Sequence, residues 1–219
     1  QVPSARTSHL GVPIFSPLDG VPRKVTSGLG ADRDGGKRRH RGIDFDSTTG
    51  EPVRAIAAGV VTFAGLDMRR GKSQRIPASV ARRVKRSRVG AGGMMVMVQH
   101  EQGLMSAYMH LSDYTVKTGD RVEGGQQIGR VGRSGIKRSS AHLHFELRKD
   151  ERHVDPIPVL APYIFGPRDT WWGKRAALIE EGRRRLRRIR RWRDRKAKRA
   201  RGAAKAAAAK AKAKLTGEP

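Results

Sequence analysis

Short apolar runs separated by glycine-rich turns fill most of this sequence, and that spacing limits the folds open to the chain. From about residue 12 to residue 165, segments such as GMMVMVQH (93–100) and GLMSAYMHL (103–111) are apolar or alternate over five to eight residues. Runs of this length between turn residues are typical of strands. No segment of the region has a convincing helical period. We therefore predict an all-β or β-rich domain.

Two local predictions follow from this pattern. Residues 51–65, EPVRAIAAGVVTFAG, predict a hairpin centred on Gly59. Residues 67–92 interrupt the strand rhythm, because nine of them are Lys or Arg and only Asp67 is acidic. We expect an exposed excursion between two strands, with a short helix over PASVARRV (77–84). A solvated loop is favoured over a dedicated binding element, although loops that flank a site often carry specificity.

The C-terminal part has a different composition. The formal charge of the chain is +27, and residues 174–219 hold 19 Lys and Arg against four acids, hence +15. Leu178, Leu186, Ile189 and Trp192 fall near one face of a helix, and the Ala/Lys end is expected to be disordered. The predicted organisation is an N-terminal extension (1–11), one domain (12–165) and a basic tail (166–219).

Several classes of site are excluded or left open by composition. The chain has no cysteine, so a thiolate zinc site and a cysteine nucleophile are excluded, and any metal must bind His and carboxylate. No apolar run reaches the length of a membrane-spanning helix. The chain begins at Gln1, which suggests that an N-terminal segment has been removed.

Three histidine-containing segments could carry chemistry. In SSAHLHFELRKD (139–150) the side chains of His142, His144 and Glu146 share one face of a strand, because strand side chains alternate. Two imidazoles on one face can reach one ion, but a polar sheet face is the commoner explanation of such a pair. Glu146 is expected to support the site as a structural carboxylate and not to act as its general base.

The other two segments are also weak when taken singly. In RRHRGIDFDS, Gly42 would allow the chain to bend so that His40 and Asp44 share a metal, with Asp46 as a substitute ligand. In SAYMHLSDY, alternation would place Tyr108 and His110 on one face. The ordinary alternatives are a loop histidine beside a surface carboxylate and a half-buried histidine.

In order and spacing, however, the segments resemble the lysostaphin/LytM-type zinc endopeptidases, peptidase family M23. The shared motifs are HRGIDF, YMHLS, VKTGDRVEGGQQIGRVG and HLHFELRKD followed by VDP, and the resemblance covers about residues 10–158. It implies an antiparallel metallopeptidase core of the duplicated hybrid motif type. By resemblance, His40, Asp44 and His144 bind Zn²⁺, and His110 and His142 stand beside it as catalytic residues whose roles the sequence does not divide.

The implied function is hydrolysis of peptide bonds in bacterial peptidoglycan, with zinc lowering the pKa of a water molecule and polarising the scissile carbonyl. The chain departs from the family where Ser139, Ser140 and Ala141 replace the common Thr-Gly-Pro lead and where the basic excursion is longer than usual. These departures affect the expected shape of the substrate groove, and hence which substrate it binds. The ligands are all present.

Expectations about partners rest on the charge. A basic tail binds polyanions with little selectivity, so anionic envelope polymers and a membrane surface are candidate partners beside peptidoglycan, and nucleic acid is a weaker one. We expect a periplasmic or secreted monomer.

Three other functions compete with the peptidase. They are a non-catalytic wall-binding or amidase-activating module of the same fold, a nucleic-acid-binding protein that acts through the tail, and a carrier domain. Carrier domains share the V-x-x-G-x-x-V hairpin, but no Lys at a hairpin tip suits a lipoyl carrier, and a phosphocarrier does not require His40 and Asp44.

Overall fold

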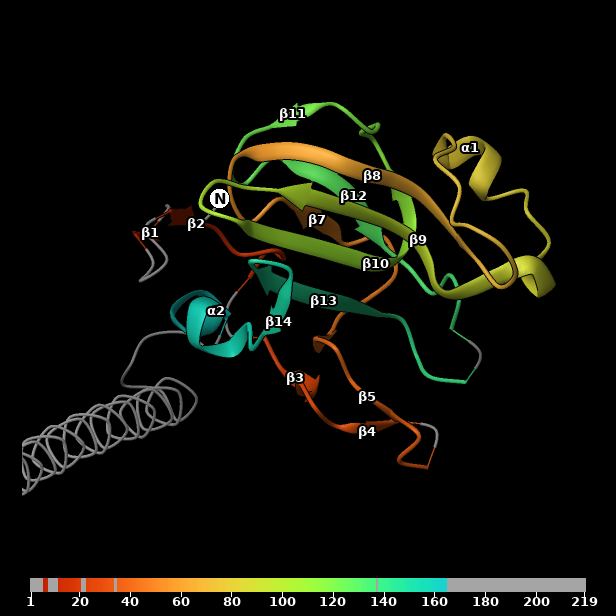
Figure 1. Ribbon diagram of the computed structural model, residues 1–219, viewed down its shortest axis with the longest axis horizontal. Helices are drawn as coiled ribbons and strands as arrows, with labels where there is room; N and C mark the ends of the chain where they lie inside the picture. Colours follow the sequence, from red (N-terminus) through yellow and green to blue (C-terminus); the bar gives the residue numbers. More distant parts are fainter. Residues whose placement is uncertain (1–5, 8–11, 21–22, 34, 137, 165–219) are drawn as a thin grey trace, which may run out of the picture. The chain divides into compact units, whose positions relative to one another are not determined.

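A ten-stranded antiparallel sheet dominates the computed structural model (Figure 1). The structure describes residues 6–7, 12–20, 23–33, 35–136 and 138–164. Seven strands form the main path of the sheet, in the order β11 (Arg121–Val122), β8 (Gly59–Met68), β9 (Val89–Gln99), β10 (Leu104–Tyr114), β13 (His142–Lys149), β6 (Ile43–Asp46) and β3 (Val25–Ser27). The prediction of a mainly β, antiparallel domain is confirmed.

The remaining elements are short. Three more strands extend the sheet: β12 (Gln127–Val131) pairs with β10 and with β7 (Pro52–Arg54), and β14 (Arg152–Val154) pairs with β13. Two pairs of strands lie outside it, β1 (Arg6–Thr7) with β2 (Pro13–Ile14) and β4 (Asp32–Arg33) with β5 (Arg38–Arg39). The helices are α1 (Ala78–Ala81), a 3₁₀ turn η1 (Arg86–Arg88) and α2 (Ile157–Ile164). None of the helices in the described ranges is long and apolar enough to cross a membrane.

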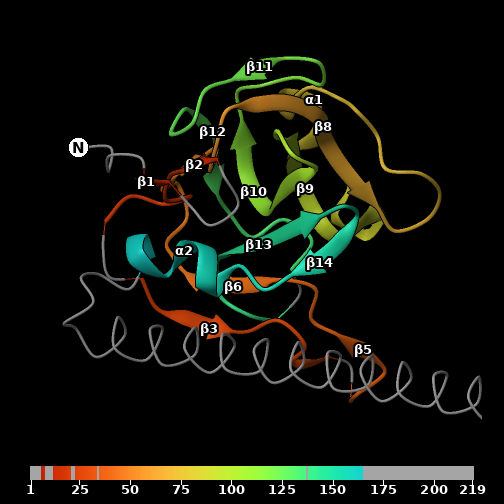
Figure 2. The same cartoon turned by 60° about the vertical axis from the view of Figure 1, so that its left-hand side comes forward.

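Strand β13 shows how the sheet separates core from site. Leu143, Phe145 and Leu147 are fully buried on one face, and each contributes about 1.5–3 kcal/mol by leaving water. Tyr108 of β10 meets the Phe145 ring edge-on at 5.3 Å between centroids. The opposite face of β13 carries the histidines. Figure 2 shows β13 beside β6, with the β13–β14 hairpin extending from it.

The predicted hairpin at Gly59 is wrong. Strand β7 pairs with β12, and β8 pairs with β9 and β11, so the segments on either side of Gly59 are not partners. Gly59 is the first residue of β8, where a Cβ atom would lie 2.3 Å from the carbonyl oxygen of Gln99. The glycine therefore permits close approach of β9 and does not form a turn.

The basic excursion lies between β8 and β9, and α1 falls within the predicted PASVARRV segment. Both strands run further than expected, so the part outside them covers only residues 69–88. Asp67 anchors it, accepting hydrogen bonds from the Gly92 amide at 2.8 Å and the Ser73 hydroxyl at 3.2 Å. The predicted basic tail, 166–219, lies outside the described residues.

Candidate metal centre

Strands β6 and β13 bring the first two predicted ligands together. Asp44 and His144 are directly opposite each other in the register of this pair. Because opposite residues of antiparallel strands point to the same face, the Asp44 carboxylate meets the imidazole, with 2.8 Å between Asp44 Oδ1 and His144 Nδ1. Both side chains are buried.

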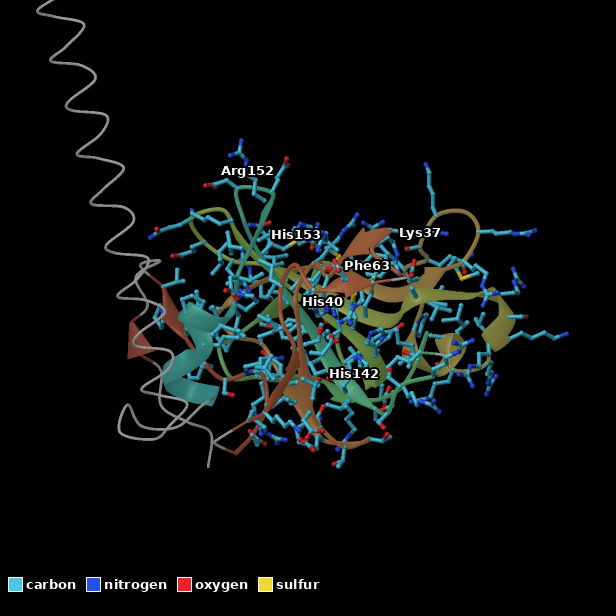
Figure 3. The ribbon with its side chains drawn as sticks, turned by 90° about the horizontal axis from the view of Figure 1, so that it is seen from below. Lys37, His40, Phe63, His142, Arg152 and His153 are labelled. Atoms are coloured by element: carbon cyan, nitrogen blue, oxygen red, sulfur yellow. The ribbon has the colours of Figure 1, made fainter. Side chains whose placement is uncertain are left out.

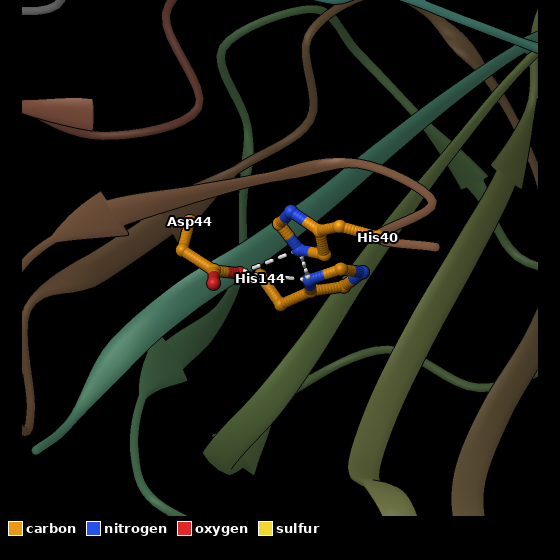
Figure 4. A group of neighbouring side chains, drawn as sticks. All are labelled: His40, Asp44 and His144. Atoms are coloured by element: carbon orange, nitrogen blue, oxygen red, sulfur yellow. Dashed lines mark hydrogen bonds and ion pairs between the residues drawn. The ribbon is translucent and has the colours of Figure 1, made fainter. Parts of the chain in front are cut away.

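His40 reaches the same point from the segment before β6. Its Nε2 atom lies 3.1 Å from Asp44 Oδ1 and 2.9 Å from His144 Nδ1 (Figure 4). Gly42 makes this possible, since a Cβ atom there would lie 2.1 Å from the carbonyl oxygen of Phe145. The predicted bend at Gly42 is therefore present, and it rests on close packing of the chain against β13.

The outward-facing nitrogens of both imidazoles are occupied. His40 donates its Nδ1–H to the carbonyl of Gly28 at 2.8 Å, and His144 donates its Nε2–H to Glu146 at 3.3 Å. Each neutral ring then turns a lone pair toward the other and toward Asp44. Two lone pairs and a carboxylate oxygen within 4.8 Å of one another repel unless a cation or proton lies among them. The group therefore suits a metal ion.

Glu146 supports His144 and is itself held in place. Its second oxygen accepts hydrogen bonds from Arg148 at 2.8 Å and from His153 at 3.0 Å. Burial opposes the charged carboxylate, but the hydrogen bonds from His144, Arg148 and His153 outweigh it and lower the pKa of Glu146 to about 2. An ionised Glu146 fixes the tautomer of His144, in agreement with the supporting role expected from the sequence.

The same electrostatics act on the ligands. Burial would raise the pKa of Asp44, but when protons occupy the Asp44-facing nitrogens of His144 and His40, hydrogen bonds from these rings hold the pKa far below its ordinary value. Burial would lower the pKa of His144, but Asp44 and Glu146 raise it. The lowered pKa of Asp44 and the raised pKa of His144 both show that the site favours positive charge beside the Asp44 carboxylate.

Arg33 is a site residue that sequence reasoning missed. It extends from β4, and its Nη2 atom lies 2.6 Å from Asp44 Oδ2. The two carboxylate oxygens therefore have separate partners, Oδ1 toward the imidazoles and Oδ2 toward the guanidinium. The only sequence signal was an arginine in the segment ADRD, which reaches Asp44 through a two-stranded hairpin that local patterns do not reveal. Asp46, the suggested substitute ligand, lies outside the cluster.

His110 and His142 stand beside the three ligands. The ring of His110 lies 4.9 Å from that of His142 and 5.7 Å from that of His144, between centroids. His110 donates Nδ1–H to Ser134 at 3.0 Å and His142 donates Nδ1–H to Ser140 at 2.9 Å, both to backbone carbonyls. Figure 3 shows His142 near His40, away from Arg152 at the tip of the β13–β14 hairpin.

The prediction that Tyr108 and His110 share a face is wrong. Tyr108 is fully buried and opposes Phe145, on the core side of the sheet. His110 has φ of 64°, and the register with β9 shifts between Tyr108 and Leu111. This bulge breaks the alternation and turns the imidazole toward the ligands, as bulges beside active sites do. Burial, with His144 and His142 nearby, lowers the pKa of His110 to about 3.

With this geometry in place, comparison with known proteins decides the family. Residues 38–156 match the family described as peptidase family M23. The chain is an M23 peptidase-family protein. The matched range includes the five predicted site residues, His40, Asp44, His110, His142 and His144, and it agrees with the resemblance read from the motifs.

Two curated relatives and one solved structure illustrate the relationship of this M23 chain. It is 36% identical over 125 residues to the DD-carboxypeptidase/endopeptidase Mpg of Neisseria gonorrhoeae, over 57% of the chain and 24% of the relative. It is 31% identical over 131 residues to lysostaphin of Staphylococcus simulans, over 58% and 22% respectively. The matched segment thus spans about a quarter of these relatives' length.

The fold comparison agrees. The structure of the antimicrobial peptidase lysostaphin from Staphylococcus simulans superposes with a TM-score of 0.50 at 29% identity, covering 71% of this chain and 59% of that one. In this M23 domain the predicted ligands His40, Asp44 and His144 lie together, and their binding of a metal ion stays a prediction. The bulge at His110 and the contact from Arg33 came from the structure.

Proposed function

We propose that this chain is a zinc-dependent endopeptidase that hydrolyses peptide bonds in bacterial peptidoglycan, in the stem peptide or the cross-bridge. The observation that carries the proposal is the convergence of His40 Nε2, Asp44 Oδ1 and His144 Nδ1, each oriented by a second hydrogen bond or ion pair. Membership of family M23 supports it.

The donor set favours zinc among the biological metals. Two imidazole nitrogens and one carboxylate oxygen are a common three-residue set for catalytic zinc, which keeps a further position open. Hard cations such as Mg²⁺ and Ca²⁺ prefer oxygen ligands. Bound zinc would act as a Lewis acid toward water and the scissile carbonyl.

His110 and His142 supply the proton chemistry in this proposal. Each uses its Nδ1–H for a backbone carbonyl, so the neutral ring has its lone pair on Nε2. Such a nitrogen can accept a proton during attack and return it to the leaving amine. A protonated or hydrogen-bonded ring can also stabilise the oxyanion. The low pKa of His110 keeps it neutral before reaction.

The names of the relatives support peptide-bond hydrolysis. They include the glycyl-glycine endopeptidase ALE-1 of Staphylococcus capitis, at 32% identity over 135 residues and 32% of its length, as well as Mpg and lysostaphin. The activities in these names differ, so the names do not identify which peptide bond this chain would cut.

The test is digestion of purified sacculi of several cross-link types by the full chain, with and without a chelator, followed by mass spectrometry of the new termini. We expect zinc-dependent release of peptides by the native protein and none by His40→Ala or His144→Ala, both with native circular dichroism. Bound zinc with no cleavage of any sacculus would instead support a wall-binding or amidase-activating module.

We also propose that the basic tail retains the enzyme on an anionic envelope outside the cytoplasm. Its support is the +15 charge of residues 174–219, which releases counterions when it binds a polyanion. Deletion of 174–219 should weaken binding to walls or envelope vesicles at low salt and leave cleavage of soluble peptides intact. Unchanged binding would contradict this role, and stronger binding to DNA than to walls would favour a nucleic-acid partner.

A further inference from the structure

The basic excursion 69–88 forms one wall of a cavity of about 480 Å³ that no step of the proposed mechanism uses. Arg69, Arg86, Ser87, Val89 and Gly135 line it. The first four come from the β8–β9 connection and its end, and Gly135 comes from the segment that leads into β13. Figure 1 shows both connections at the same end of the sheet.

The charge of this cavity is unbalanced. The excursion holds nine Lys and Arg and no acid. Within the described part of the chain, only Arg82 among these nine forms a salt bridge, with Asp113 at 2.9 Å. Arg69 and Arg86 thus present two positive charges and the Ser87 hydroxyl with no carboxylate to neutralise them. Such a set of donors suits a carboxylate or another anion.

The cavity opens at the surface, and the segment that forms part of its wall also contacts the site. Arg86 donates from Nη2 to the Ile136 carbonyl at 2.6 Å. A Cβ atom on Gly135 would lie 2.5 Å from the Gly90 carbonyl oxygen, so this segment packs directly on β9. Ser134, the residue before Gly135, accepts the hydrogen bond of His110. One short segment therefore touches both the cavity and the catalytic side of the metal centre.

We propose that the cavity is a specificity subsite that binds a free carboxylate of the peptide substrate. This rests on the proposed function and narrows its substrate class to peptides that carry a carboxylate close to the scissile bond, such as stem peptides, as distinct from neutral glycine bridges. A peptide bound at the metal centre would reach the cavity along the 134–136 segment. Arg69 and Arg86 would then bind its carboxylate and so determine which peptide bond lies at the metal.

Arg69 is the residue to test, because Arg86 also holds the Ile136 carbonyl and its loss would disturb the segment behind His110. Arg83 provides the matched control, since it is exposed in the same excursion and does not line the cavity. Arg69→Gln and Arg83→Gln each remove one positive charge. A general electrostatic effect would therefore be equal in the two variants.

The experiment compares two cross-linked muropeptides that differ only in whether the stem carboxylate is free or amidated. For the zinc-loaded full chain we expect kcat/KM about tenfold higher for the free carboxylate, the value of about one charge-assisted hydrogen bond. Arg69→Gln should abolish this preference through KM with kcat little changed, and Arg83→Gln should retain it. Equal cleavage of both peptides by the native protein, or equal losses in the two variants, would overturn the subsite.

Calorimetric titration of both peptides into metal-free protein separates this inference from the proposed function. If no peptide is cleaved but the Arg69-dependent preference persists in binding, the subsite stands and the peptidase proposal fails. If peptides are cleaved but neither is preferred in binding, the peptidase proposal stands and the subsite fails. An Arg69→Gln variant that loses affinity for a short DNA oligonucleotide and keeps its peptide preference would assign the cavity to phosphate and overturn the proposal.

Discussion

Arg33 lies 2.6 Å from Asp44, on the carboxylate oxygen that does not face the imidazoles. Because Arg33 occupies Oδ2, Asp44 would hold the proposed metal ion through Oδ1. Outer partners of metal ligands typically change affinity or activity by about 10–100-fold when removed. We therefore expect Arg33→Ala to weaken zinc binding by that factor, measured by competition with a chromophoric chelator.

A matched control comes from the same hairpin. Arg39 pairs with Asp32, and both side chains are exposed. Exposed pairs contribute little, so Arg39→Ala should bind zinc as the native protein does. Arg33→Lys should recover part of the affinity, since an ammonium keeps the charge but not the planar fork. Equal affinities of Arg33→Ala and Arg39→Ala would show that Asp44 needs no orienting partner.

Gly42→Ala should damage both the fold and the metal centre. The new Cβ would meet the Phe145 carbonyl at 2.1 Å, so β6 and β13 must separate. We expect a loss of about 1–3 kcal/mol in unfolding free energy, typical of overpacking, together with weaker zinc binding. Urea denaturation with and without zinc measures both effects.

The control for that substitution is Gly28→Ala. Gly28 supplies its carbonyl to His40, but a Cβ atom there would have open space around it. The change adds the same methyl group without a clash, so stability should change by less than about 0.5 kcal/mol. A Gly42→Ala protein as stable as Gly28→Ala would contradict the packing explanation of the bend before Asp44.

The sequence could predict those parts of the site that depend on local alternation and spacing. His142, His144 and Glu146 share a face because β13 is a regular strand, and Gly42 marks a close approach that only glycine permits. These features are encoded within a few residues, and the resemblance to family M23 joined them into one site.

The parts that failed depend on pairing between distant strands. Alternation placed Tyr108 with His110, but a bulge between β9 and β10 turns His110 to the other face. Gly59 looked like a turn residue, although its role is set by the neighbouring strand β9. Arg33 reaches Asp44 across a hairpin whose strands are two residues long, too short to show a period. Tertiary context decided all three.

Tyr108→Phe should destabilise the protein although it keeps the ring. The Ile56 amide donates to the Tyr108 hydroxyl at 2.8 Å, and Ser106 donates to it at 3.0 Å, all within the buried core. Phenylalanine would leave the Ile56 N–H without an acceptor, at a cost of about 1–3 kcal/mol. Chemical denaturation measures this loss.

The same change at Tyr114 serves as the comparison. Its hydroxyl donates to the Ile76 carbonyl in the basic excursion, where Ile76 is only partly buried. Water can replace a lost donor at such a carbonyl, so Tyr114→Phe should cost less than Tyr108→Phe. A larger loss for Tyr114→Phe would mean that the excursion stabilises the domain more than the core hydrogen bond does.

His100 should make folding stability depend on pH. It is buried, its Nδ1–H donates to the Ala58 carbonyl at 2.9 Å, and Nε2 lies 2.8 Å from Ser106 Oγ. Burial lowers the pKa of His100 below its ordinary value, outweighing the backbone hydrogen bonds that favour the charged form. The unfolded chain therefore binds a proton near pH 6.5 that the folded chain does not, and stability falls as the pH drops below that value.

This group alone can contribute up to about 1.4 kcal/mol per pH unit between the ordinary pKa and the lowered one. Urea denaturation of chelator-treated native protein and of His100→Gln, at pH 7.5 and 5.5, isolates the contribution, because the other histidines are common to both. The native protein should lose more stability between the two pH values than the variant. An equal loss in the variant would mean that other groups cause the pH dependence. It would contradict a lowered pKa of His100 in the folded protein.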